Sequence, residues 1–420
     1  MANQCLLSLA LIMRDAAEEI LACLESCAAS VDEMVIADTG SRDASVKTVR
    51  KFLRRWQAAV PGRRGKLYEI QWQDDFATAR NYVLSRCRGA WVIFLDSDER
   101  LSADTRGNLR QVIESLALGR LPAGVQRVRI PGRGLPEGGQ IDLLELWREN
   151  VDLSCRPLPG TPDDLAVRIL RRQEGLRYQG EVHEQLLFAD GRELKVALAD
   201  KQLLSVLHTG YRPEVGGEKT ARNWRILRKE ERQGGSTCLL DYYLADMYLE
   251  QGKWQQAISR AEKALGGNLP VHDSIAPHRI ICQALRELEK EACREAGLEI
   301  AEGEPLPPAS PEEPAPLQRL RSLRRRIDHE LASVIAAWSY YPDFYYFRGG
   351  RRWNGGDKAG GKADLEHALA LAEAFPRAHP ELDFRFRELM PSLMAALEQV
   401  RREWEEQQQN NRKGLTKNEE

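Results

Sequence analysis

The stretch Trp91-Val-Ile-Phe-Leu-Asp-Ser-Asp98 joins five consecutive apolar residues to two carboxylates that stand two positions apart. An apolar run of this length is typical of a strand that is buried on both faces. Side chains two apart on an extended segment point to the same side, so Asp96 and Asp98 converge on one spot beyond the strand. The stretch therefore predicts a buried strand that ends in a pair of acidic side chains.

Upstream of this stretch, apolar runs alternate with segments of helical spacing. The residue pattern predicts strands at 5–12, 34–37, 66–72 and 91–95, with helices at 15–29, 44–60 and 76–86 between them. Strands that alternate with helices in this way indicate a parallel sheet with right-handed crossovers. Ligands bind beyond the carboxyl ends of the strands in such sheets, which is where Asp38 and Asp96 fall.

Length and composition favour a cytoplasmic protein of several domains. The chain has 420 residues, more than the roughly 250–300 at which a single core stops growing. A formal net charge of −2 gives no electrostatic reason to expect a nucleic-acid partner. Residues 1–13 are apolar but lack a basic leader region, and no segment reaches the roughly 20 apolar residues that a transmembrane helix needs. The eight cysteines include no Cys-x-x-Cys pair, so nothing requires an oxidising compartment.

The sequence pattern divides the chain into five parts. We expect an α/β catalytic domain at 1–212, in which strand-like stretches recur at 126–130 and 165–170. A helical, tetratricopeptide-like region is expected at 213–300, followed by a Pro/Glu-rich linker at 301–317. A second helical region is expected at 318–400, and 401–420 is expected to be a disordered tail.

The helical prediction rests on the spacing of small and apolar residues. Residues 238–264 are predicted to form two helices joined at Gln251-Gly252-Lys253, with Ala257, Ala261 and Ala264 spaced as in a tetratricopeptide repeat. One such repeat cannot bury its own faces, so neighbouring helices are needed. Residues 342–348 and 363–374 have the features of a degenerate second repeat.

The paired carboxylates admit two interpretations. Hard oxygen ligands of this kind suit Mg²⁺ or Mn²⁺, which keep several waters and bridge to ligand phosphates. The purely structural alternative is an acidic turn that starts the next helix. Because Asp96 and Asp98 follow the fourth strand of a βα series, we favour the metal site.

Other polar residues are candidates with structural alternatives. Asp38, in Asp38-Thr-Gly-Ser-Arg-Asp43, either accepts hydrogen bonds from a nucleoside or opens a turn before the next helix. Arg80 either pairs with a phosphate or pocket carboxylate, or lies on the surface. His183 and His208 are each either a metal ligand or base, or a structural histidine. No Gly-x-Gly-x-x-Gly loop follows the first strand, which argues against a dinucleotide fold.

Several motifs, taken in order, resemble one family. The stretches at 8–15, 38–43, 75–81, 91–101 and 183–185 look like those of family 2 glycosyltransferases of GT-A fold. The resemblance covers about residues 5–211. A branch with a catalytic domain followed by tetratricopeptide-like helices, which includes sublancin-type peptide S-glycosyltransferases, is similar in length and layout. One departure is that the first strand commonly ends in Lys-Asn-Glu in the family, whereas Arg14-Asp-Ala16 stands here.

The resemblance implies an inverting transferase that uses a UDP-sugar with Mn²⁺ or Mg²⁺. Asp38 and Arg80 would contact the nucleoside. Asp96 would contact the ribose or the metal-bound phosphate, and Asp98 the metal. His208 would be a further contact to the metal or the diphosphate.

The same resemblance places His183 and Glu184 beside the acceptor, with Glu184 as the first choice of catalytic base. Transfer of a hexose to a Cys, Ser or Thr side chain of a peptide or protein is the leading hypothesis, because helical repeats often hold extended peptides. The repeats would equally suit homodimer formation. Two alternatives stay open, namely a lipopolysaccharide or other cell-surface saccharide as acceptor, and an inactive scaffold that binds partners through its repeats.

Overall fold

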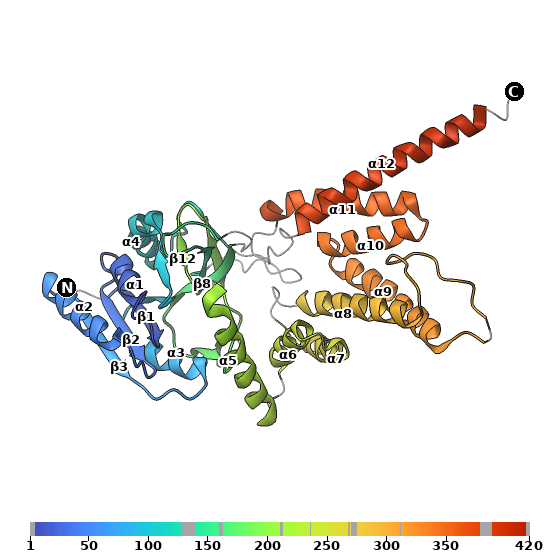
Figure 1. The fold of residues 1–420 in the computed structure, drawn as a ribbon. Coiled ribbons are helices and arrows are strands. Elements are labelled where there is room, and N and C mark those ends of the chain that lie inside the picture. Colours follow the sequence, from blue (N-terminus) through green and yellow to red (C-terminus); the bar gives the residue numbers. More distant parts are fainter. Residues whose placement is uncertain are drawn as a thin grey trace. The chain divides into compact units, whose positions relative to one another are not determined.

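The structure is a computed structural model that describes residues 5–127, 139–158, 163–210, 213–235, 237–267, 269, 275–310, 312–378 and 389–416. It consists of two compact units, Met1–Gly234 and Gly235–Glu420 (Figure 1). The first unit is α/β and the second is helical, which confirms the predicted fold class.

The first unit is built around one large mixed sheet. The strands of this unit are β1 Leu7–Met13, β2 Glu33–Asp38, β3 Arg64–Glu69, β4 Trp91–Asp96, β5 Glu99–Leu101, β6 Val125–Arg127, β7 Leu143–Asn150, β8 Asp164–Arg171, β9 Leu176–Gln179, β10 Gln185–Phe188, β11 Val196–Ala199 and β12 Ser205–His208. Strands β9 and β10 pair with each other in a separate two-stranded sheet. Its helices are α1 Ile20–Cys27, α2 Ser45–Ala59, α3 Phe76–Leu84, α4 Ala103–Ala117 and α5 Pro213–Arg232.

The strand order separates a parallel half from a mixed half. Strands β3, β2, β1 and β4 lie side by side and are all parallel, as predicted. Strand β8 joins β4 in the antiparallel direction and is followed by β7, β11 and β6. Strand β12 is parallel to β7 and antiparallel to the short strand β5. Because β5 follows β4 in the chain, the pairing of β12 with β5 places β12 near the end of β4.

Helices cover the two faces of the parallel half differently. One face packs apolar residues of β1, β2 and β4 against α1, α2 and α4, with the side chains of Leu24, Leu53 and Leu109 buried between them. The opposite face packs against α3 and the β9–β10 hairpin, where Phe94 and Tyr178 meet edge to face. Both faces of the strands are thereby buried, which accounts for their continuous apolar sequence.

The second unit consists of packed helices. They are α6 Cys238–Glu250, α7 Trp254–Leu265, α8 Ala276–Glu295, α9 Ala315–Ala337, α10 Pro342–Asn354, α11 Lys358–Ala378 and α12 Leu389–Thr416. Helices α6 and α7 form the predicted pair, which turns at Gly252 with a positive φ of 69°. The small residues Ala257 and Ala261 are fully buried, so the two helices pack closely.

Helices α10 and α11 approach each other through glycine. A Cβ atom on Gly349 of α10 would lie 3.0 Å from the backbone oxygen of Gly361, and one on Gly361 would lie 2.6 Å from the backbone nitrogen of Trp353. These two elements include the segments that the sequence indicated as a degenerate repeat. Close backbone contact here requires residues without a side chain.

Two predicted boundaries differ from the structure. Helix α5 belongs to the first unit, so the unit ends at Gly234 rather than at residue 212. The expected disordered tail at 401–420 is wrong for its described part, because α12 continues to Thr416. Leu393, Leu397 and Val400 are buried, and this apolar stripe anchors the helix that the polar sequence then extends.

Candidate functional site

The strand register brings the acidic strand ends together. Met13 of β1 lies opposite Asp38 of β2, and Ile12 of β1 lies opposite Asp96 of β4. Asp38 and Asp96 thus end the two strands that flank β1, as the parallel sheet predicted. The carboxyl edge of β2, β1 and β4 is the base of the candidate site.

Asp38 shapes the turn that follows β2. Its carboxylate accepts hydrogen bonds from the backbone N–H groups of Gly40 and Ser41, at 3.1 and 3.0 Å, and from the Ser41 hydroxyl. Gly40 has a φ of 107°, which is a conformation that favours glycine. The turn-forming alternative is therefore present in the structure, while contact with a nucleoside stays a prediction.

The loops after β1 and β2 are hydrogen-bonded to each other. The backbone N–H of Asp15 donates to the Ser41 hydroxyl at 2.9 Å, and Asp15 accepts from the backbone N–H of Arg42 at 2.7 Å. The backbone N–H of Ala17 donates to the Asp43 carboxylate at 2.9 Å. These contacts fix the loop that contains Arg14-Asp-Ala16.

Asp98 and His208 lie side by side although 110 positions separate them in the chain. The Asp98 carboxylate is 3.7 Å from Nε2 of His208, and both side chains are largely buried. Nδ1 of His208 is 2.8 Å from Oδ1 of Asn150. If Nε2 bound a metal ion, Nδ1 would carry the proton and donate it to Oδ1 of Asn150.

Strand pairing explains why these three residues meet. The parallel register of β7 and β12 places Asn150 beside His208, and the antiparallel register of β5 and β12 places Glu99 opposite His208. The backbone N–H of Thr209 also donates to the carbonyl oxygen of Asp98 at 3.0 Å. Sequence reasoning missed Asn150, because its role depends on the pairing of strands in the mixed half.

Asp96 is held by two arginines. One carboxylate oxygen accepts from Nη2 of Arg80 at 2.8 Å, and the other accepts from Nη2 of Arg168 at 3.1 Å. Arg168 of β8 also donates to Glu99 at 2.6 Å. Burial alone would raise the pKa of Asp96, but Arg80 and Arg168 outweigh it and lower that pKa to about 2. Arg168 and Glu99 were not among the predicted site residues.

Arg80 links Asp96 to Glu184. Its Nε donates to the Glu184 carboxylate while Nη2 contacts Asp96. Its guanidinium carbon lies 4.5 Å from the ring centre of Phe94 and 5.6 Å from that of Tyr178. The structure thus gives Arg80 two carboxylate partners, which is the pairing with a pocket carboxylate that the sequence allowed.

His183 and Glu184 lie between β9 and β10. The backbone of His183 has a φ of 55°, which is unusual for a residue other than glycine. The residue is exposed at the surface, and desolvation by neighbouring protein atoms, together with the charge of Arg222, lowers the pKa of its imidazole to about 4. His183 is therefore neutral at pH 7, whereas Glu184 has Arg80 as its ionic partner.

Arg222 of α5 adds a positive charge that sequence reasoning did not identify. Its guanidinium carbon lies 4.9 Å from the ring centre of Phe76, and it is close enough to Glu184 and Asp98 to interact with their charges. Partial burial lowers the pKa of Arg222. Ion pairs from Arg225 to Asp74, at 2.8 Å, and from Lys229 to Glu181, at 3.5 Å, hold α5 against the loops of the site.

The arrangement partly fits the predicted metal site. Across the described residues, no three His, Cys, Asp or Glu side chains are grouped so as to bind a metal ion. The pair of Asp98 and His208 nevertheless suits Mg²⁺ or Mn²⁺, because these ions keep several water ligands and bridge to phosphate groups. Both oxygens of Asp96 contact arginines, so Asp98 is the better placed of the two acids.

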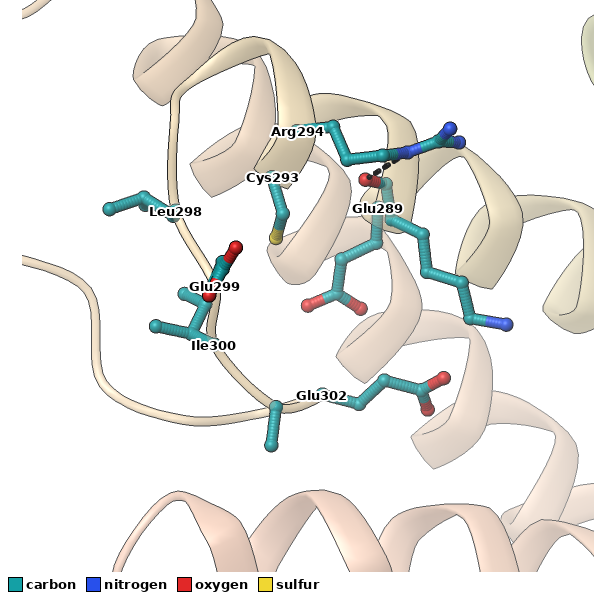
Figure 2. Close-up of a pocket in the computed structure, with 9 residues that line it drawn as sticks. Glu289, Cys293, Arg294, Leu298, Glu299, Ile300 and Glu302 are labelled. Carbon is teal, nitrogen blue, oxygen red and sulfur yellow. Dashed lines mark hydrogen bonds between the residues drawn. The ribbon is translucent and has the colours of Figure 1, made fainter.

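The second unit has a surface pocket that contains none of the predicted site residues (Figure 2). Glu289, Cys293 and Arg294 of α8 line it together with Leu298, Ile300 and Glu302. Glu289 forms ion pairs with Arg324 and Arg351 at 2.6 Å each, which is a buried structural network.

In the part of the chain that the structure describes, no helix is long and apolar enough to cross a membrane.

The first unit is a mostly parallel α/β domain with acidic side chains at the carboxyl edge of its sheet. Residues 8–125 match the model of the glycosyl transferase family 2. The match lies within the first unit, and the second unit consists of packed helices.

Two curated relatives share parts of this layout. A TPR repeat-containing protein of Synechococcus elongatus is 28% identical over 282 residues, which cover 61% of this chain and 65% of the relative. The SPbeta prophage-derived glycosyltransferase SunS of Bacillus subtilis is 26% identical over 106 residues, which cover 25% of this chain and 23% of SunS. The chain thus spans less than two thirds of the length of either relative.

Solved structures give distant likenesses. A Staphylococcus aureus TarS fragment in complex with UDP-GlcNAc has a TM-score of 0.35 and 15% identity, with 87% of this chain and 92% of TarS 1–349 covered. A mannosyltransferase from Pyrobaculum calidifontis, in complex with GDP-Man and Mn²⁺, has a TM-score of 0.37 and 14% identity, with 89% of this chain and 87% of that chain covered.

Proposed function

We propose that this protein is an inverting glycosyltransferase that moves a hexose from a UDP-sugar to a peptide or protein side chain. The observation that carries the donor half is the pairing of Asp98 with a histidine that Asn150 orients, at the carboxyl edge of the sheet. A family 2 domain with this edge supports nucleotide-sugar chemistry.

On the donor side, Asp98 and His208 would hold Mn²⁺ or Mg²⁺, and such an ion would neutralise charge on the departing diphosphate. Asp96, fixed by its two arginines, would hydrogen-bond the ribose or the phosphate. Asp38 would contact the nucleoside at the end of β2. Arg222 would contact the diphosphate from α5, because phosphate groups and guanidinium donors match in geometry and charge.

On the acceptor side, Glu184 would take the proton of the attacking hydroxyl or thiol. The bond from the acceptor oxygen or sulfur to the anomeric carbon forms as the bond from that carbon to UDP breaks, which inverts the configuration. His183, the residue before Glu184, is the second candidate for the base.

The helical unit supports a peptide or protein acceptor, because repeat helices commonly bind extended chains. The relative in Synechococcus combines a similar stretch of sequence with TPR repeats by name. Association of two copies through these helices would be a further use of the same unit. A cell-surface saccharide remains the second candidate acceptor, since the donor site would serve either.

A donor and acceptor panel tests the proposal. Purified protein with Mn²⁺ is incubated with UDP-glucose, UDP-galactose, UDP-GlcNAc or GDP-mannose, and free nucleotide is measured. We expect turnover of at least one UDP-sugar, which increases when a peptide library containing Cys, Ser and Thr is added. Stimulation by oligosaccharides alone would establish the saccharide alternative, and no turnover of any donor would support the inactive scaffold.

A further inference from the structure

Arg80 occupies an unusual place between the two halves of the site. It extends from α3 and contacts Asp96 at the end of β4 on one side and Glu184, between β9 and β10, on the other. Asp96 belongs to the proposed donor half and Glu184 to the proposed acceptor half. One guanidinium group therefore joins the carboxylates on which both halves depend.

The local structure fixes this guanidinium in position. Arg80 is only 8% exposed and its guanidinium stacks on the rings of Phe94 and Tyr178. The next residue, Asn81, both donates to the carbonyl oxygen and accepts from the N–H of Tyr178, at 2.8 Å each. The backbone N–H of Phe76 donates to the carbonyl oxygen of Glu181 at 2.8 Å. Helix α3 is thereby attached to Tyr178 and Glu181, the two ends of the segment that leads to Glu184.

Charge balance shows that Arg80 does more than neutralise Asp96. Arg168 already contacts the second oxygen of Asp96. The side chain of Glu184 is only 11% exposed and needs a positive partner. Arg80 forms the ion pair with it, and the charge of Arg222 acts on it from α5. Its Nε binds Oε1, and among the described residues no hydrogen bond is made to Oε2.

We propose that Arg80 is a positioning residue that holds Oε1 of Glu184 and so turns Oε2 toward the acceptor. This inference rests on the proposed function of Glu184 as the base. Proton transfer from an acceptor requires the base within hydrogen-bond reach, and misplacement by about 1 Å can lower the rate by roughly 100-fold. Arg80 would then act on the reaction through Glu184 without touching the sugar.

A double-mutant cycle on UDP-hexose hydrolysis in Mn²⁺ tests this assignment, with the full-length protein and water as the acceptor. We expect Arg80→Gln to lower kcat by about 100-fold while UDP affinity falls by less than about threefold. In a Glu184→Gln background, Arg80→Gln should cause no more loss of kcat than Arg168→Gln does, because only its contact with Asp96 is left to lose. Arg80→Lys, which keeps the charge, should retain at least about a tenth of the rate.

Two controls make the result specific. Arg86 stacks on Tyr82 near the end of the same helix, so Arg86→Gln tests for loss of a stacked arginine outside the site. Arg168→Gln removes the other arginine of Asp96, which does not contact Glu184, and its effect should multiply with that of Glu184→Gln. Losses from Arg80→Gln and Glu184→Gln that also multiply would overturn the positioning role and leave the proposed function intact. A wild-type rate in Glu184→Gln would overturn both Glu184 as the base and the role of Arg80.

Discussion

At the scale of single residues, the site depends on partners that hold the functional side chains. Asp96 and Asp98 were predictable, because a two-residue period on a strand end puts them on one side. Asn150 and Arg168 were not, since they reach the site only through the register of β7, β8 and β12. A local pattern identifies a carboxylate, whereas its partner is set by pairing over long distances in the sequence.

Removing the group that orients His208 should weaken metal binding. Asn150→Ala leaves Nδ1 of His208 without the acceptor at 2.8 Å, so the ring loses its fixed orientation. Loss of such a partner typically lowers metal affinity by about 10- to 100-fold. We expect the Mn²⁺ concentration for half-maximal hydrolysis to rise by that factor. Asn108→Ala on α4, outside the site, is the control, and an unchanged Mn²⁺ requirement in Asn150→Ala would contradict the account.

The lowered pKa of His183 has a consequence for stability. Its pKa falls from 6.5 to about 4 on folding, so between these pH values the unfolded chain binds a proton that the folded chain does not. The free energy of unfolding should therefore decrease as the pH drops through this window. His183→Gln should show a smaller decrease between pH 7 and pH 4.5 in urea denaturation. An equal decrease in both proteins would show that His183 does not contribute.

At the scale of elements, the parallel strands were predicted from their apolar runs, and α1 to α3 from their spacing. The mixed half was only partly predicted. Buried and half-buried residues follow each other irregularly in β7 and β8, and β11 and β12 have four residues each, too few for a periodic signal. Helix α5 was expected in the helical region, because its sequence does not show that Arg225 and Lys229 pair with loops of the first unit.

Helix α3 is the element that carries Arg80, and Asp75 caps its start. The Asp75 carboxylate accepts from the Thr78 N–H at 2.9 Å and from the Thr78 hydroxyl at 2.6 Å. Asp75→Ala should lower the free energy of unfolding by about 1 kcal/mol, as measured in urea. Ser102→Ala removes the corresponding cap of α4 and should cost a similar amount. Only Asp75→Ala should also reduce the hydrolysis of the UDP-sugar. If Asp75→Ala and Ser102→Ala reduced hydrolysis equally, the role of α3 in holding Arg80 would be contradicted.

At the scale of the whole molecule, the division at Gly234 predicts which fragment is functional. A fragment of residues 1–234 keeps α5 and its ion pairs with the site loops, whereas a fragment of residues 1–212 loses Arg222 together with them. We expect the longer fragment to fold and to hydrolyse a UDP-sugar slowly without modifying peptide. The shorter fragment should be less stable and bind UDP more weakly. Equal UDP affinity of the two fragments would remove α5 from the site.

The tail shows how sequence and structure differ at this scale. Its polar composition indicated disorder, yet the apolar stripe upstream, which includes Leu393 and Leu397, belongs to the same helix. Helix formation propagates more easily than it begins, so an anchored start extends into a polar segment. The composition of a terminal segment alone is therefore a poor guide to its structure.

The most direct test of the central claim is UDP-sugar turnover in Asp98→Asn, which keeps the shape of the side chain and removes its charge. The account predicts that Mn²⁺-dependent turnover falls by at least about 100-fold, because a principal contact to the ion that stabilises the leaving diphosphate is lost. Asp104→Asn, in the first turn of α4, should retain the wild-type rate. Wild-type turnover by Asp98→Asn at limiting Mn²⁺ would contradict the proposed site.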